Sequence, residues 1–121
     1  MNWNITAGRP VYVQLVEQLE LALVAGEFPP GSRIPPVREL AADAGVNPNT
    51  MQRALAELER TGLVYTQRTA GRFVTEDAAV VDSAKQELAH QQIGAFLHRM
   101  ERMGYDREQT AQLVRSWEED A

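Results

Sequence analysis

The sequence has no cysteine, which excludes a disulfide framework and thiolate chemistry. It also has no apolar run that approaches the roughly 18 residues of a membrane helix. Its first ten residues, MNWNITAGRP, lack the charged start and the apolar core of a signal peptide. We therefore expect a globular protein of a reducing compartment, with a cytoplasmic location and no membrane partner.

Positive charge is scarce, because 12 Lys and Arg stand against 17 Asp and Glu, a net charge of −5. That balance argues at first against a nucleic-acid partner. The charge is uneven, however, and residues 33–72 hold six arginines but only four acidic side chains. A local basic patch affects DNA affinity more than the total charge does. The middle of the chain is therefore the candidate region for DNA contact, and an acidic tail follows it.

Helical patterns occupy three segments before residue 62. Residues 10–26 begin with proline, end with glycine and carry one apolar face. Residues 27–36 contain four prolines and a glycine, which predicts a loop. Residues 37–45, VRELAADAG, form a short predicted helix that Gly45 closes. The third helix has Asn47 as its N-cap and Pro48 at its first position, and it ends at Gly62.

Two short strands, Leu63–Thr66 and Arg72–Thr75, are predicted after these helices, with a polar tip between them. A short helix, a turn containing glycine and a second helix describe a helix-turn-helix, and a following hairpin makes the unit winged. A recognition helix enters the major groove with its N-terminal residues, which explains a polar start such as NPNT. A well-capped helix start is the alternative interpretation of those four residues.

A long helix up to Gly104 and a shorter last helix are predicted after residue 76, and Asp106 with Gln109 resembles a capping box. The apolar stripe of this tail is too long for the small N-terminal domain to cover, and a monomer would leave it exposed. We therefore expect an isologous homodimer, unless the tail packs back on its own domain. The expected interface residues are Val81, Leu88, Ile93, Phe96, Met100, Met103, Leu113, Val114 and Trp117.

A family resemblance lies in the run PPGSRIPPVRELAADAGVNPNTMQRALAELERTGLVYTQRTAGRFV. This run resembles the DNA-binding domain of the GntR family of bacterial transcription regulators, over about Val11 to Thr75. The short helical remainder resembles the YtrA subfamily, whose two-helix tail dimerises, and it leaves no room for the larger effector-binding domain of other subfamilies. The expected fold is mainly α with a small β hairpin: a winged helix-turn-helix domain at residues 1–76 and a two-helix C-terminal dimerisation tail at residues 77–121.

The resemblance also implies roles for single residues. Arg38 matches the arginine that reaches DNA in the family, although a solvated helix arginine is the alternative. Arg33 matches a loop arginine that either braces the loop or touches phosphate, and Gly71 matches the glycine of the wing tip. The DNA-binding residues expected from the resemblance and from the polar helix start are Arg33, Arg38, Asn47, Asn49, Thr50, Gln52, Arg53, Arg68, Gly71 and Arg72.

The chain departs from the family pattern at three places. Many relatives have arginine at the position of Gln52, whereas here Arg53 follows it. One residue is about 100° around a helix, so we expect Arg53 to face phosphate while Gln52 meets a base. In the wing, Thr69 replaces a glycine and Arg72 replaces a threonine, which adds a cation. Pro36 stands where a serine would cap the short helix.

The sequence contains few residue patterns typical of catalytic or metal-binding sites. Glu87 and His90 have the i, i+3 spacing of some metal sites, but the further ligands that such sites need are missing, and a solvated helix face explains the pair better. No serine has a neighbouring base of the kind that activates a nucleophile. We therefore expect no enzyme, no metal and no cofactor.

Two functions remain open from the sequence. The first is a sequence-specific transcription regulator, a repressor that binds a palindromic operator in double-stranded DNA as a homodimer. The alternative is a winged-helix adaptor that binds protein and not DNA. DNA binding is favoured if the four arginines Arg38, Arg53, Arg68 and Arg72 share a surface with the start of the third helix. The adaptor is favoured if they pair with Glu39, Glu57 and Glu59.

Overall fold

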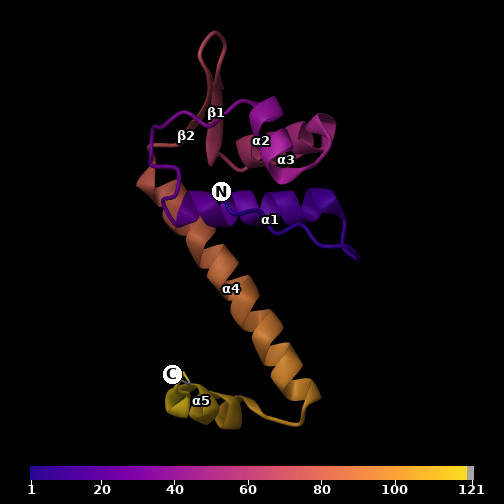
Figure 1. The fold of residues 1–121 in the computed structure, drawn as a ribbon. Coiled ribbons are helices and arrows are strands. Elements are labelled where there is room, and N and C mark those ends of the chain that lie inside the picture. The colour runs from indigo at the N-terminus through magenta and orange to yellow at the C-terminus, as the bar shows by residue number, and fades with distance from the viewer. Residues whose placement is uncertain (120–121) are drawn as a thin grey trace. The chain divides into compact units, whose positions relative to one another are not determined.

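The computed structural model describes residues 1–119 and divides into two compact units, Met1–Lys85 and a second unit that begins at Gln86. Five helices and one hairpin follow each other in the predicted order (Figure 1). They are α1 (Val11–Val24), α2 (Val37–Ala44), α3 (Pro48–Arg60), β1 (Val64–Gln67), β2 (Gly71–Val74), α4 (Ala78–Arg102) and α5 (Arg107–Ser116).

The core of the first unit lies between α1, α2 and α3. The predicted stripe of α3 is confirmed, because Met51, Ala54, Leu55 and Leu58 are all fully buried. They pack against leucines of α1 and against Leu40 and Ala41 of α2. Burial of this apolar surface is the main force that holds the three helices together.

The start of α3 follows the predicted capping chemistry. The Oδ1 atom of Asn47 accepts a hydrogen bond from the backbone N–H of Asn49 at 2.8 Å, and Pro48 occupies the first helical position. The preceding helix α2 ends at Gly45 in the left-handed conformation, with φ of 70°, which glycine adopts at little cost. As Pro36 predicts, no side chain caps α2 at its N-terminus.

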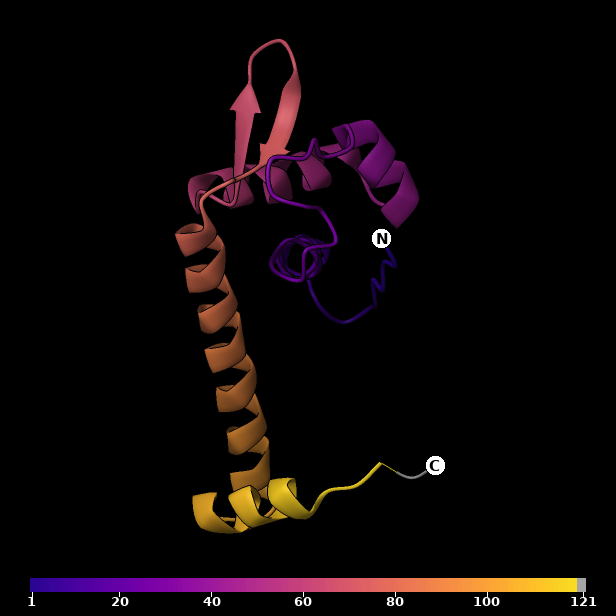
Figure 2. The ribbon, with the colours of Figure 1, turned by 90° about the vertical axis from the view of Figure 1, so that its left-hand side faces the viewer.

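The hairpin is antiparallel, with Val64 opposite Val74 and Thr66 opposite Arg72. Each strand lies one residue nearer the tip than the sequence predicts, and the hairpin extends away from the three helices (Figure 2). The loop before α2 pairs with β2, because the N–H of Ile34 donates to the carbonyl of Arg72 at 2.9 Å. The N–H of Val74 donates to the carbonyl of Ser32 at 2.9 Å. The proline-rich loop is therefore an edge of the wing, which the sequence did not predict.

The first unit includes the first turns of α4. Val80, Val81 and Ala84 are half-buried against its core. Val81, which the sequence predicts to lie in the dimer interface, is half-buried against the core of its own domain. These contacts are consistent with a compact unit that extends to Lys85.

The second unit contains the rest of α4 and α5. The predicted capping box at the start of α5 is confirmed: Asp106 Oδ1 accepts from the N–H of Gln109, and Gln109 Oε1 accepts from the N–H of Asp106. Thr110 is buried and its hydroxyl donates to the carbonyl of Asp106. Within residues 1–119, no helix is long and apolar enough to cross a membrane.

Candidate nucleic-acid interface

The start of α3 presents polar side chains to solvent. Asn47, Asn49, Gln52 and Arg53 are exposed and Thr50 is half-buried. The oxygen of the Asn47 side chain caps the helix, and its NH₂ group remains available to donate to a further partner. The predicted cap at Asn47 is therefore present, and Asn49, Gln52 and Arg53 beside it stay exposed to solvent. The unpaired N–H groups and the helix dipole add a positive potential at the same place.

Arg53 lies against α1. Its guanidinium sits 4.6 Å from the centre of the Tyr12 ring, within the range of a cation–π interaction. The ring restricts the side chain while leaving it exposed to solvent. Tyr12 was not identified from the sequence, since its partner lies 41 residues away in another helix.

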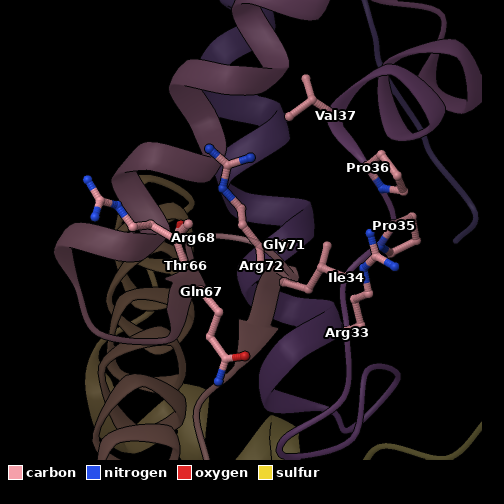
Figure 3. A pocket seen from close by; sticks show the side chains of 10 residues that line it. All are labelled: Arg33, Ile34, Pro35, Pro36, Val37, Thr66, Gln67, Arg68, Gly71 and Arg72. Atoms are coloured by element: carbon pink, nitrogen blue, oxygen red, sulfur yellow. The ribbon is translucent and has the colours of Figure 1, made fainter.

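A cleft of about 300 Å³ brings the loop, the start of α2 and the wing together. Figure 3 shows Arg33 on the loop side, Arg72 in the middle and Arg68 on the opposite side, pointing away from Arg33. Arg38 follows directly after Val37, which lines the cleft. The residues that line it are Arg33, Ile34, Pro35, Pro36, Val37, Thr66, Gln67, Arg68, Gly71 and Arg72.

Gly71 has a backbone conformation that favours glycine. Its φ is +107°, which other residues rarely adopt, and a Cβ atom added there would lie 3.0 Å from Nε of Arg33. The guanidinium of Arg33 therefore rests directly on the backbone at the start of β2. This contact supports the bracing role for Arg33, one of the two that the resemblance implied.

Arg72 is not a free cation of the wing. Its Nε donates to Oε1 of Glu59 at 2.6 Å, and the side chain of Arg72 is only 19% exposed. The Thr66 hydroxyl donates to the same carboxylate oxygen at 2.5 Å. Hydrogen bonds from Thr66 and Arg72, with the charge of Arg72, hold the pKa of the Glu59 carboxyl below its ordinary value, although partial burial opposes this.

The other three arginines that distinguish the two functions are free of such pairs. Among residues 1–119, no carboxylate forms an ion pair with Arg38, Arg53 or Arg68. Glu57 pairs instead with Arg60, one turn away on the same helix, at 2.5 Å. Of the four arginines, Arg72 therefore pairs with one of the three named glutamates, and within residues 1–119 Arg38, Arg53 and Arg68 do not.

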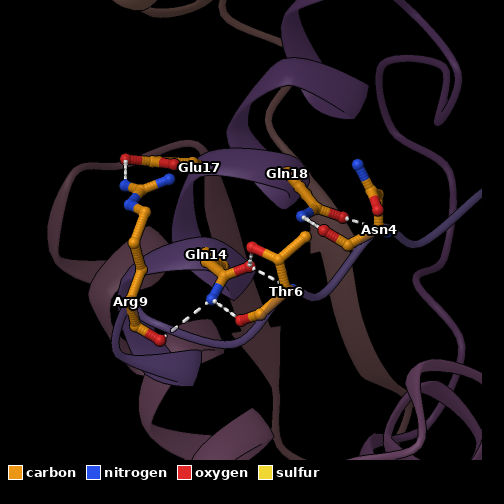
Figure 4. A network of polar contacts seen from close by, with 6 residues as sticks. All are labelled: Asn4, Thr6, Arg9, Gln14, Glu17 and Gln18. Atoms are coloured by element: carbon orange, nitrogen blue, oxygen red, sulfur yellow. Dashed lines mark hydrogen bonds and ion pairs between the residues drawn. The ribbon is translucent and has the colours of Figure 1, made fainter.

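The N-terminal residues are held by two glutamines of α1, a feature that the sequence did not reveal (Figure 4). The carboxamide of Gln14 pairs with both backbone groups of Thr6, at 2.8 Å each. Gln18, one turn later, does the same with Asn4, at 2.9 and 2.8 Å. The indole N–H of Trp3 then donates to Asp43 of α2 at 3.0 Å. The segment before α1 therefore links α1 to α2.

The tail residues of the second unit form an apolar surface. Trp117 is 70% exposed and Met103 is 64% exposed, and Ile93, Leu113 and Val114 are also exposed. Leu88, Phe96 and Met100 are half-buried. Phe96, Met100, Leu113, Val114 and Trp117 line a groove of about 370 Å³. We name this the tail groove.

Comparison with known protein families identifies the family of this chain. Residues 11–74 match the family described as bacterial regulatory proteins, gntR family. The chain belongs to the GntR family. It is 35% identical over 119 residues to the uncharacterized HTH-type transcriptional regulator YhcF of Bacillus subtilis. This match covers 98% of each of the two chains. It is 41% identical over 69 residues to the transcriptional repressor YtrA of the same organism, covering 57% of this chain and 53% of YtrA.

Solved structures agree with this assignment. A GntR family transcriptional regulator from Listeria monocytogenes superposes with a TM-score of 0.86 at 34% identity, covering 94% of this chain and all of that one. The DNA-binding domain of AraR in complex with its operator ORX1 superposes with a TM-score of 0.56 at 26% identity. It covers 62% of this chain and 96% of the AraR domain. The GntR chain described here is therefore a DNA-binding transcription regulator and not an enzyme, and the adaptor alternative is set aside.

Proposed function

We propose that this GntR regulator is a repressor that binds a palindromic operator as a homodimer. The observation that carries the proposal is the exposed polar start of α3, which lies in the same compact domain as an arginine-lined wing cleft. An α-helix start fits the major groove, where asparagine and glutamine side chains can read base edges. Asn47, Asn49, Thr50 and Gln52 are the proposed base-reading residues.

The backbone of the operator would meet exposed arginines of the same domain. Arg38 on α2, Arg53 beside Tyr12 and Arg68 on the hairpin tip have no acidic partner within residues 1–119. Such free guanidinium groups suit phosphate contact or, for Arg38, a bidentate bond to guanine. This assignment is consistent with a net negative chain, because only the local charge faces the DNA.

The second copy of the chain would cover the tail groove. A large apolar patch on a monomer is uncommon and marks an interaction surface. Two-fold symmetry places the same surface on both partners, so the tail groove of one chain would pack against the tail groove of the other. The proposed interface residues are Leu88, Ile93, Phe96, Met100, Met103, Leu113, Val114 and Trp117.

Repression is supported by the YtrA relative, which is named as a repressor. A repressor needs only to occupy its operator, because a bound dimer excludes other proteins from the same DNA. Its working place would then be the cytoplasm, where a bacterium keeps its chromosome.

Substitution of two free arginines tests the DNA contacts. Arg38→Ala is expected to weaken operator binding by about 1–3 kcal/mol with a smaller effect on random DNA, because a bidentate contact to a base is lost. Arg53→Ala is expected to weaken operator and random DNA about equally, because a phosphate contact carries no sequence information. Fluorescence anisotropy on an operator duplex and a scrambled duplex measures both effects.

Arg60→Ala is the matched control, since it removes one exposed arginine charge from α3 at the end away from the recognition residues. It should leave both affinities within about twofold. If Arg53→Ala weakens only the operator complex, Arg53 reads a base and the assignment of Gln52 and Arg53 must be reversed. If Arg38→Ala behaves like Arg60→Ala, the proposed surface is wrong.

A further inference from the structure

A single carboxylate oxygen joins the recognition helix to both strands of the wing. Oε1 of Glu59, in the last turns of α3, accepts from the Thr66 hydroxyl of β1 and from Nε of Arg72 of β2. Thr66 and Arg72 are directly opposite each other in the hairpin register, so their side chains share one face of the sheet. We name these three residues the wing clamp.

The wing clamp sits between the fixed base of the hairpin and its free tip. At the base, Val64 and Val74 are opposite each other and buried in the core. One pair beyond the clamp, Gln67 lies opposite Gly71, and the tip follows. The hydrophobic core holds the hairpin at its base. A contact halfway along the hairpin therefore affects the angle between the hairpin and α3.

The other side of the hairpin is held as well. Arg33 rests on Gly71, and the loop strand around it bonds to β2. Glu59 therefore restrains the wing from α3 while Arg33 restrains it from the loop. With both restraints, the distance between the exposed tip residue Arg68 and the start of α3 is set before DNA arrives, which reduces the ordering cost of binding.

The charges of the clamp also favour a positioning role. An unpaired carboxylate on the recognition helix would repel phosphate, and Arg72 neutralises it at 2.6 Å. The same pairing uses Nε of Arg72 and leaves its side chain mostly covered. Arg72 is thus poorly placed to act as a separate phosphate ligand.

We propose that Glu59 is a positioning residue that sets the angle of the wing to the recognition helix, and that Arg72 acts through Glu59 rather than through DNA. The proposal replaces the expectation that Arg72 supplies a DNA-contacting cation. It rests on the DNA binding of the family and not on the dimer or on repression, so those proposals can fail separately.

A double-mutant cycle in the full-length chain tests the wing clamp. The test compares Glu59→Gln, Arg72→Gln and the double variant on two DNA duplexes. One duplex carries the preferred site, which is first selected from a random DNA library with the unmodified protein. The other is a scrambled duplex of the same composition. Each single variant is expected to weaken binding to the preferred site about tenfold, as expected for the loss of one charge-assisted hydrogen bond. The double variant should be no weaker than the weaker single variant, because both remove the same link.

The salt dependence separates positioning from contact. If Arg72 acts through Glu59, Arg72→Gln leaves the slope of log affinity against log salt unchanged. If Arg72 binds phosphate, the slope falls by about one per subunit and the effects of the two substitutions multiply, which overturns the proposal. Glu57→Gln is the matched control, since it makes the same charge change on α3 but its ion pair is with Arg60 and not with the wing. It should not weaken binding.

Hydrogen exchange in the free protein gives a reading that needs no DNA. Glu59→Gln is expected to speed exchange of the β1 and β2 amides near Thr66 and Arg72 while the amides of α1 keep their protection. Unchanged exchange in the hairpin would overturn the proposal. General unfolding of the variant would show as lost protection in α1. In that case Thr66→Val is the milder variant, because it removes one hydrogen bond of the wing clamp and no charge. It is also expected to speed exchange of the hairpin amides.

Discussion

A chain that ends at Lys85 is expected to fold and to sediment as a monomer. It should bind the operator at least about 100-fold more weakly than the full chain, because linking two binding modules raises the overall affinity by about 10²–10⁴. The first unit has its own buried core of leucines, methionine and valines from α1, α2, α3 and the hairpin. It keeps Val80, Val81 and Ala84, which pack on that core. Only the proposed dimer surface is removed.

Two further chains make this result specific. A chain that ends at Thr75 loses those three packed residues as well, so we expect a lower melting temperature than for the chain ending at Lys85. In the full chain, Leu113→Glu places a charge in the tail groove and should produce monomers, whereas Gln112→Glu adds the same charge at its exposed neighbour and should not. A Lys85 chain that retained full operator affinity would contradict the dimer proposal.

Operator affinity is expected to fall by about a thousandfold between about 50 and 200 mM salt, which corresponds to six or more neutralised phosphates per dimer. Arg38, Arg53 and Arg68 supply three candidate contacts in each subunit. A chain of net charge −5 without a local basic surface would gain nothing from low salt, because its overall charge repels DNA. A flat plot of log affinity against log salt would therefore show that the arginines do not face the backbone.

The parts of the fold that the sequence predicted are those with local causes. The Asn47 cap, the Asp106–Gln109 capping box and the apolar stripe of α3 each depend on residues within one or two turns of each other. Their backbone geometry follows from spacing and side-chain chemistry alone. The family motifs then connected these elements to DNA binding.

The contacts that the sequence did not predict join residues far apart in the chain. Tyr12 meets Arg53 from another helix, and the proline-rich loop pairs with β2. Arg72 was predicted to add a cation to the wing because it replaces a threonine of the family pattern. Its pairing with Glu59 depends on the angle between α3 and the hairpin, which no local pattern encodes. The packing of Val81 on the core of the first unit was not predicted either, since helical spacing does not say which neighbour covers an apolar residue.

Selection of binding sites from a random duplex library with the full-length protein tests the central claim most directly. The bound DNA is sequenced after several rounds and searched for an enriched motif. We expect one half-site that occurs twice in inverted orientation at a fixed spacing of about 10 base pairs or a multiple of it, because a two-fold dimer presents two identical recognition helices. A pool without an enriched sequence, or a single half-site without its inverted copy, would contradict the proposal of a homodimeric operator-binding regulator.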